Sequence, residues 1–269
     1  MAVTSMDDIA SGLATSQQFN FFFPSATNVA GGWINLNRAV TTSFGQQAVP
    51  TSYASGGTLH DDSQVGFPTG KNPTAPALSY LAQIKATFAT AGTIHLYDRV
   101  WSCSAMVGNV ATAQTVVSFP TLTRPDANGN GLEIWIECYT ATGSTASNVT
   151  VQYTNSAGVS GRNTVSTAHI TSMPANRMYQ VPLQSGDTGV KSIQSVTLSV
   201  STGTAGSFGV SLMRRLSSIS AVVPNVGQTM DFTQLGLPQI YDNAALTFVN
   251  QGTTTSSGII MGAFNVIQK

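Results

Sequence analysis

Alternation of apolar and polar residues with a period of two is the feature that most limits how this chain can fold. The clearest run covers residues 132–139, where apolar side chains alternate with charged or aromatic ones. The alternation returns at residues 94–101, 149–153, 196–200 and 208–212, and two more strand candidates cover 246–249 and 259–266. Successive side chains of a strand point to opposite faces, so each run predicts a strand with one face in a core.

Turn-forming residues separate these runs, and no long helices alternate with them. Roughly eight strands joined by short polar turns predict an all-β protein, an antiparallel β sandwich of the jelly-roll or a related type. Residues 76–269 are assigned to this sandwich. Leu78, Leu81, Ile84 and Phe88 have helical spacing, which predicts a helix at its start, although the neighbouring strands make a strand possible there as well.

The first 75 residues have a different pattern. The opening residues 4–8 (TSMDD) offer an N-cap followed by acidic residues, and Met6, Ile9, Ala10 and Leu13 fall on one helical face. This pattern predicts a helix too short to be stable without docking. The following stretch has aromatic residues but little periodicity, so we expect residues 1–75 to form an extended arm that buries its apolar side chains against other proteins. The predicted contact residues are Met6, Ile9, Leu13, Phe21, Phe22, Phe23 and Trp33.

Charge is scarce in this chain. Charged residues make up 8% of the sequence and hydrophobic residues 42%, and the formal net charge is zero. Because charge is the usual protection against association between sheet edges, its scarcity predicts that partners cover much of the surface. The alternative is an ordinary secreted β domain rich in serine and threonine.

The distribution of charge also argues against two kinds of partner. Basic residues are scattered, so we predict no binding to nucleic acid. Asp7 and Asp8 lie where a signal peptide needs positive charge, and no apolar run reaches membrane-spanning length. We therefore predict no membrane insertion and synthesis in the cytoplasm.

One loop has the residue pattern of a calcium site. Asp126, Asn128 and Asn130 supply oxygen atoms at alternate positions, a glycine is sixth, and Glu137 is twelfth. Against a metal, Pro125 precedes the loop where a helix should end, and Glu137 falls in a predicted strand. The two Asn-Gly steps also suit a hairpin turn, which we favour, so no cofactor is predicted.

Catalytic motifs are weak throughout. A single Asp187-Thr188-Gly189 triplet lacks the second copy that an aspartic protease needs, so it is interpreted as a turn. His60, His95 and His169 have no metal-ligand spacing, and Cys103 and Cys138 are interpreted as buried, reduced side chains. The chain is predicted not to be an enzyme.

Two further possibilities depend on strand faces. Trp33, Trp101 and Trp135 could form a stacking surface for sugars, or the strand faces that carry Trp101 and Trp135 could belong to the core or to a subunit contact. Glu133 and Glu137 lie on one predicted strand face, and a carboxylate pair is what a polysaccharide depolymerase requires. A solvated strand face explains that pair equally well.

Several segments resemble a family of tailed-bacteriophage virion proteins encoded among head and structural genes. The segments are residues 4–9 (TSMDDI), 91–101 (AGTIHLYDRVW), 153–162 (YTNSAGVSGR) and 183–195 (LQSGDTGVKSIQS). The resemblance implies a structural role in the virion and no catalytic residues.

The resulting hypothesis is a capsid decoration or cement protein, assembled in the host cytoplasm and located in the virion. Its expected partners are the major capsid protein or other virion proteins. We also expect the chain to form a homo-oligomer, and analogy with other jelly-roll particle proteins favours a trimer. The alternative hypothesis is a receptor- or glycan-binding module of a tail or fibre.

Overall fold

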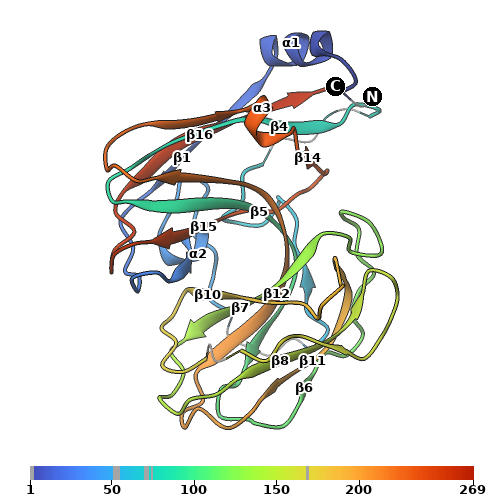
Figure 1. Cartoon of the computed structure of the whole chain (residues 1–269), viewed down its shortest axis with the longest axis vertical. Helices are drawn as coiled ribbons and strands as arrows, with labels where there is room; N and C mark the ends of the chain where they lie inside the picture. Colours follow the sequence, from blue (N-terminus) through green and yellow to red (C-terminus); the bar gives the residue numbers. More distant parts are fainter. Residues whose placement is uncertain (1–2, 51–54, 70–72, 74, 168–169) are drawn as a thin grey trace. The chain divides into compact units, whose positions relative to one another are not determined.

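The computed structural model describes residues 3–50, 55–69, 73, 75–167 and 170–269. These residues form an all-β protein (Figure 1), with sixteen strands and three short helices. The pairings that build its sheets are antiparallel, among them β1–β16, β4–β16, β7–β10, β7–β12 and β8–β11. The chain divides into two compact units. Unit 1 contains residues 1–47, 61–98 and 216–269, and unit 2 contains residues 48–60 and 99–215.

Unit 1 holds the three helices and the strands from both ends of the chain. Its helices are α1 (Met6–Ala14), α2 (Leu36–Ala39) and α3 (Phe232–Leu235). The strands that lie entirely within it are β1 (Gln17–Phe23), β2 (Trp33–Asn35), β4 (Ser79–Phe88), β13 (Gln228–Asp231), β14 (Gln239–Ile240), β15 (Leu246–Gly252) and β16 (Ile260–Gln268).

Unit 2 is built from the middle of the chain. Its own strands are β3 (Thr58–Leu59), β6 (Gln114–Thr115), β7 (Leu132–Thr140), β8 (Val149–Asn155), β9 (Arg162–Asn163), β10 (Arg177–Val181) and β11 (Val190–Leu198). Two long strands, β5 (Gly92–Met106) and β12 (Ser207–Ala221), contribute residues to both units.

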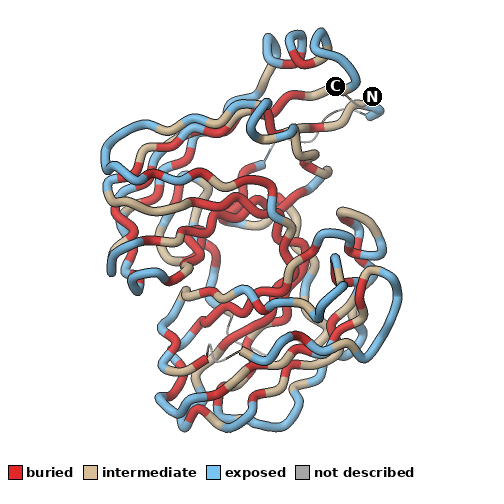
Figure 2. The backbone as a smooth tube through the Cα atoms, in the orientation of Figure 1, coloured by how far each residue is buried: buried red, intermediate tan, exposed pale blue. Residues whose placement is uncertain are grey.

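Each unit has a core between two layers of strands. In unit 1 the sheet ordered β1-β16-β4-β13 faces β15, because Phe21 of β1 and Phe264 of β16 both pack on Phe248 of β15. In unit 2 the core lies between β10-β7-β12 and β6-β11-β8-β9. Buried residues follow the inner strands of each unit, while most connecting loops are exposed (Figure 2).

The period-two runs are confirmed as strands, but many of their polar faces are also covered. In β7 seven of nine residues are buried, including Trp135 and Glu137. Most of β5 is buried on both faces as well. The all-β antiparallel class therefore follows from the alternation, and in these two strands both faces are covered rather than one.

The helix predicted over 78–88 is wrong. Residues 79–88 form strand β4, which pairs with β16 along most of its length. Leu81 and Ile84 fit a helical stripe, but together with Ala86 and Phe88 they point into the core of unit 1. The local pattern of residues 79–88 fits a helix or a strand, and pairing with β16, far along the chain, decides in favour of the strand.

The extended arm expected for residues 1–75 also needs correction. All seven residues of β1 pair with β16, and Phe21 and Phe23 lie in the core of unit 1. The predicted boundary at residue 75 does not separate the units, because segments on both sides of it belong to unit 1. The short helix is confirmed as α1, with the Ser5 hydroxyl accepting a hydrogen bond from the Asp8 amide.

Candidate functional site

One face of the sheet β1-β16-β4-β13 points away from the core of unit 1. Residues directly opposite each other on neighbouring strands share a face. Two such rows form this face, which we call the outer face: Asn20, Ala263, Lys85 and Thr229 in one row, and Phe22, Met261 and Thr87 in the other. Most of these side chains are exposed, whereas Ala263, at the centre of the first row, is buried.

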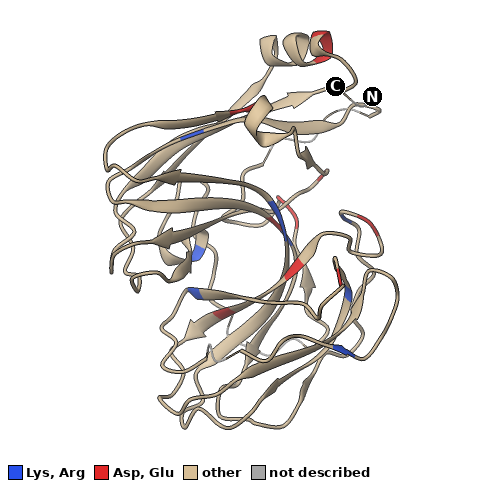
Figure 3. Cartoon of the chain, in the orientation of Figure 1, with Lys and Arg blue, Asp and Glu red and all other residues tan. Residues whose placement is uncertain are grey.

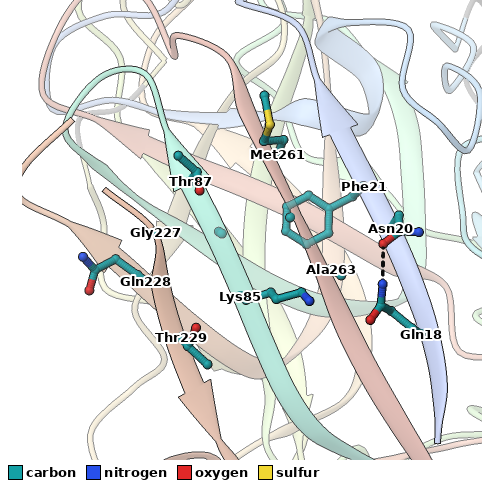
Figure 4. A pocket seen from close by; sticks show the side chains of 12 residues that line it. Gln18, Asn20, Phe21, Lys85, Thr87, Gly227, Gln228, Thr229, Met261 and Ala263 are labelled. Atoms are coloured by element: carbon teal, nitrogen blue, oxygen red, sulfur yellow. Dashed lines mark hydrogen bonds between the residues drawn. The ribbon is translucent and has the colours of Figure 1, made fainter. Parts of the chain in front are cut away.

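A groove of about 420 Å³ lies on the outer face (Figure 4). Four of its lining residues are glycine or alanine, which leave a hollow between larger neighbours. The lining residues are Gln18, Asn20, Phe21, Lys85, Ala86, Thr87, Gly227, Gln228, Thr229, Met261, Gly262 and Ala263.

Gly262 is required by the packing beneath the groove. A Cβ atom at this position would lie 2.7 Å from Cζ of Phe21 and closer still to the carbonyl oxygen of Lys85. Phe21 is buried, so its ring closes the floor of the groove from the core side. A larger residue at position 262 would push the ring or the β4 backbone out of place.

The groove combines neutral polar groups with one charge. Lys85 is the charged residue among the described residues that line it, and its side chain extends from β4 towards β16 (Figure 4). Around it are the amides of Gln18, Asn20 and Gln228, and the Gln18 amide donates to Oδ1 of Asn20 over 2.8 Å. Such groups can donate to and accept from a bound chain.

One end of the outer face is apolar. Phe22 is 44% exposed and Met261 is 48% exposed, and they are direct cross-strand partners. Ile259 lies two residues before Met261, and it is 41% exposed. Exposed apolar side chains that gather in this way are typical of surfaces that contact another protein.

The predicted contact residues are divided between surface and core. Met6, Leu13 and Phe22 are exposed, and the Trp33 ring is half-buried, 4.6 Å from the His95 ring. Ile9, Phe21 and Phe23 are buried within unit 1, so they cannot contact a partner without unfolding. Of the three apolar residues of α1, Met6 and Leu13 are therefore exposed to solvent, while Ile9 packs against unit 1.

The calcium pattern does not assemble into a site. Both oxygens of Asp126 are occupied, because Oδ1 accepts from the Asn128 and Asn130 amides and Oδ2 from the Asn130 side chain. Burial raises the pKa of Asp126, but these hydrogen bonds outweigh it and hold the pKa below its ordinary value. Glu137 instead pairs with Arg99, and no group of three or more His, Cys, Asp or Glu suited to a metal lies among the described residues.

This loop is not a simple hairpin. Gly129 and Gly131 have positive φ, as the Asn-Gly steps suggested. The turn precedes β7 and is tied to the segment before β11, since Gly131 donates to the Thr188 carbonyl and Val190 to the Gly129 carbonyl.

The Asp187 triplet is part of a polar cluster. Oδ2 of Asp187 accepts from the Tyr153 hydroxyl at 2.5 Å and from Nε of Arg162 at 2.9 Å, and Oδ1 accepts from the Asn155 amide at 2.7 Å. The hydrogen bonds from Arg162 chiefly lower the pKa of Asp187 to about 2, although burial acts in the opposite direction. Every acceptor position is used to join segments of unit 2.

Trp101, Trp135 and Glu137 on the predicted strand faces are enclosed, whereas Glu133 is only partly buried. Trp101 and Trp135 are both 0% exposed, so the sugar-stacking surface proposed for them is wrong. Glu133 accepts a hydrogen bond from the Trp135 indole at 3.0 Å, and Glu137 lies 2.8 Å from Arg99. The two glutamates therefore have separate partners.

Two histidines and two cysteines fall within the described residues. Nε2 of His60 lies 2.7 Å from the Ser102 hydroxyl, and His95 is buried beside Trp33. His169 lies outside the described residues. Cys103 and Cys138 are free and buried, as predicted, and burial is the main cause that raises the pKa of each thiol to about 12.

Charge is sparse over both units (Figure 3). No helix within the described part of the chain is long and apolar enough to cross a membrane. The groove was not predicted from the sequence. Its only local signal is the Gly262-Ala263 pair within an apolar strand, because its other small residues come together through strand register.

No family model and no curated protein sequence matches the chain. Among solved structures, the VP2 subviral particle of infectious bursal disease virus has 12% identity and a TM-score of 0.21, over 94% of this chain and 80% of that chain. A T13 particle of the same virus has 10% identity and a TM-score of 0.17, over 94% and 76% of the two chains. TM-scores this low support no assignment of fold or function.

Proposed function

We propose that this chain is a structural protein of a bacteriophage particle, a decoration or cement protein that acts through contacts with other virion proteins. The observation that carries the proposal is the outer face of unit 1, where Phe22 and Met261 are exposed beside a groove on a nearly uncharged sheet. The segments that resemble tailed-phage virion proteins point in the same direction.

The mechanism is adhesive. A stable contact buries on the order of 1,000 Å² or more, and apolar burial at its centre supplies most of the binding free energy. The partners that we propose are the major capsid protein or another virion protein, with self-association into a trimer. The jelly-roll connectivity expected from the sequence stays a prediction.

The outer face takes over the role first given to an N-terminal arm. Phe22 and the exposed residues of α1 are available for contact, whereas Phe21 and Phe23 are not. The glycan-binding alternative loses its support, because both tryptophans that suggested it are enclosed.

Purified particles of the phage that encodes this chain provide the first test. The chain should remain with particles through a density gradient at a fixed stoichiometry, and electron cryomicroscopy should locate it on their surface. Expression in infected cells without retention on the particles would overturn the proposal.

Variants of the outer face provide the second test. Phe22→Ser combined with Met261→Ser should weaken binding to particles that lack the chain by about tenfold, since exposed aromatic anchors dominate such contacts. Val200→Ser is the matched control, because Val200 is also 44% exposed but belongs to unit 2. Equal binding by the double variant and the control would exclude the outer face.

A further inference from the structure

Lys85 carries a positive charge that no described residue neutralises. It is exposed at the centre of the outer face, and its ammonium has no ion pair or hydrogen bond with any described residue. Other cations of the chain do have partners: Lys269 lies 3.4 Å from Asp8, and Arg162 lies 2.9 Å from Asp187. Lys191 likewise has no ion pair or hydrogen bond with any described residue, but of these two lysines only Lys85 lines the groove.

The surroundings of Lys85 leave it available. Its cross-strand neighbours are Ala263 and Thr229, which carry no charge. Asp231, on the adjacent strand β13, is directed elsewhere, because Oδ1 of its carboxylate accepts from the Thr233 amide at 3.0 Å as part of the cap of α3. A carboxylate that entered the groove would meet the ammonium without competition from these groups.

The spacing of charge and apolar surface suits an extended chain. The Lys85 row and the Phe22–Met261 row are one two-residue step apart along the strands, which corresponds to roughly 7 Å. In an extended segment, side chains two residues apart point to the same face at the same spacing. An acidic residue and an apolar residue separated by one position would therefore reach both features together.

We infer that the groove holds an extended segment of a partner virion protein, which places an acidic side chain on Lys85 and an apolar side chain over Phe22 and Met261. The inference rests on the proposed function and adds the chemistry of the partner. A protein segment is favoured over a small anion because the apolar surface continues past the groove to Ile259.

Binding to particles that lack the chain tests the inference in the assembly. Lys85→Glu should lower the affinity about tenfold or more by charge repulsion, and Lys85→Gln should lower it less and weaken the salt dependence. Lys191→Glu is the control, since Lys191 is an exposed lysine of unit 2. Unchanged binding by Lys85→Glu, or an equal loss in the control, would overturn the inference.

A peptide titration separates this inference from the proposed function. The probe is the capped peptide Thr-Leu-Ser-Asp-Thr-Ser, followed by NMR shifts of Lys85 and Thr87 in the full chain. These shifts should move with the peptide, and should move little with its Asn analogue or with sodium acetate. Equal shifts with acetate would indicate a small-anion site instead and overturn the inference.

The remaining results divide the two proposals. If the wild-type chain does not bind particles but the peptide shifts appear, the proposed function fails. The groove would then still bind an acidic extended segment, but not one that belongs to a virion protein. If the wild-type chain binds particles but Lys85→Glu changes only self-association, measured by light scattering, the occupant is a second copy and the inference fails.

Discussion

Arg162 and Asp187 face each other as a two-pronged ion pair, with Nε to Oδ2 at 2.9 Å and Nη2 to Oδ1 at 3.1 Å. The pair joins the segment 153–162, which ends at Arg162, to the segment 183–195, which contains Asp187. Tyr153 and Asn155 bind the same carboxylate from β8. The cluster holds the loop before β11 to the end of β8.

Asp187→Asn should lower the free energy of unfolding by about 1–3 kcal/mol, because it leaves Arg162 and the Tyr153 hydroxyl with a poorer acceptor in a largely buried place. Urea denaturation followed by tryptophan fluorescence would measure the loss. Asp242→Asn is the control, since Asp242 is exposed. A loss no larger than in the control would contradict a stabilising role for the cluster.

The same cluster predicts a pH dependence. The pKa of Asp187 falls from an ordinary value of 3.8 to about 2 in the folded protein, so its contribution to stability is complete above 3.8 and is lost as the pH falls towards 2. The stability difference between wild type and Asp187→Asn should therefore shrink across this interval. A difference that stayed constant from neutral pH down to 2 would refute this assignment.

Gly262→Ala should destabilise the protein by about 1–3 kcal/mol, the usual cost of adding an atom to a filled place, because the new Cβ meets the Phe21 ring and the β4 backbone. Gly227→Ala is a matched control in the lining of the same groove, since its Cβ would come no closer than 3.6 Å to Thr87. Thermal denaturation should give a lower midpoint temperature for Gly262→Ala than for Gly227→Ala. Similar midpoint temperatures would show that the Phe21 ring and the β4 backbone can move aside for the added methyl group.

Glu137→Ala should cost about 3–5 kcal/mol, because it leaves the Arg99 guanidinium without its buried partner. The double variant Arg99→Met with Glu137→Leu should recover much of that loss. Arg215→Ala is the comparison, because its 3.8 Å pair with Glu133 is largely exposed, and exposed pairs contribute about 1 kcal/mol or less. Chemical denaturation should be measured for Glu137→Ala, the double variant and Arg215→Ala. An equal loss in the free energy of unfolding for Glu137→Ala and Arg215→Ala would contradict the prediction.

The native protein should resist thiol reagents at pH 8. Cys103 and Cys138 are buried, and burial raises the pKa of both thiols to about 12, so almost no thiolate is present or accessible. Mass spectrometry after iodoacetamide treatment should show no adduct in buffer and two adducts in urea. Rapid labelling in buffer would mean that the core of unit 2 opens readily.

The sequence predicted where the strands lie better than it predicted which residues cover their side chains. Residues 132–139 alternate clearly enough to predict β7, but nothing local indicates that Glu137 would find Arg99 and be buried with it. The helical spacing of Leu81, Ile84 and Phe88 was misleading because the apolar positions of this ten-residue segment fit a helix or a strand equally well. Partners distant in sequence decide both outcomes.

The interpretation of the first residues failed for the same reason. The strand that pairs with β1 begins at Ile260, so the seven residues from Gln17 to Phe23 look unstructured when considered alone. The groove is also a product of register, since it depends on Ala86 lying opposite Gly262. Local pattern predicted that Phe22 would face a partner but could not distinguish it from Phe21 and Phe23.

The pairing of β1 with β16 has a consequence for biosynthesis. While the chain emerges from the ribosome, residues 17–23 lack their neighbour until residues 260–268 have been translated, whereas all of unit 2 is available once residue 215 has emerged. Domains fold as units during synthesis. We therefore expect unit 2 to fold before unit 1, with the aromatic side chains of β1 left without their strand partner until residues 260–268 have emerged.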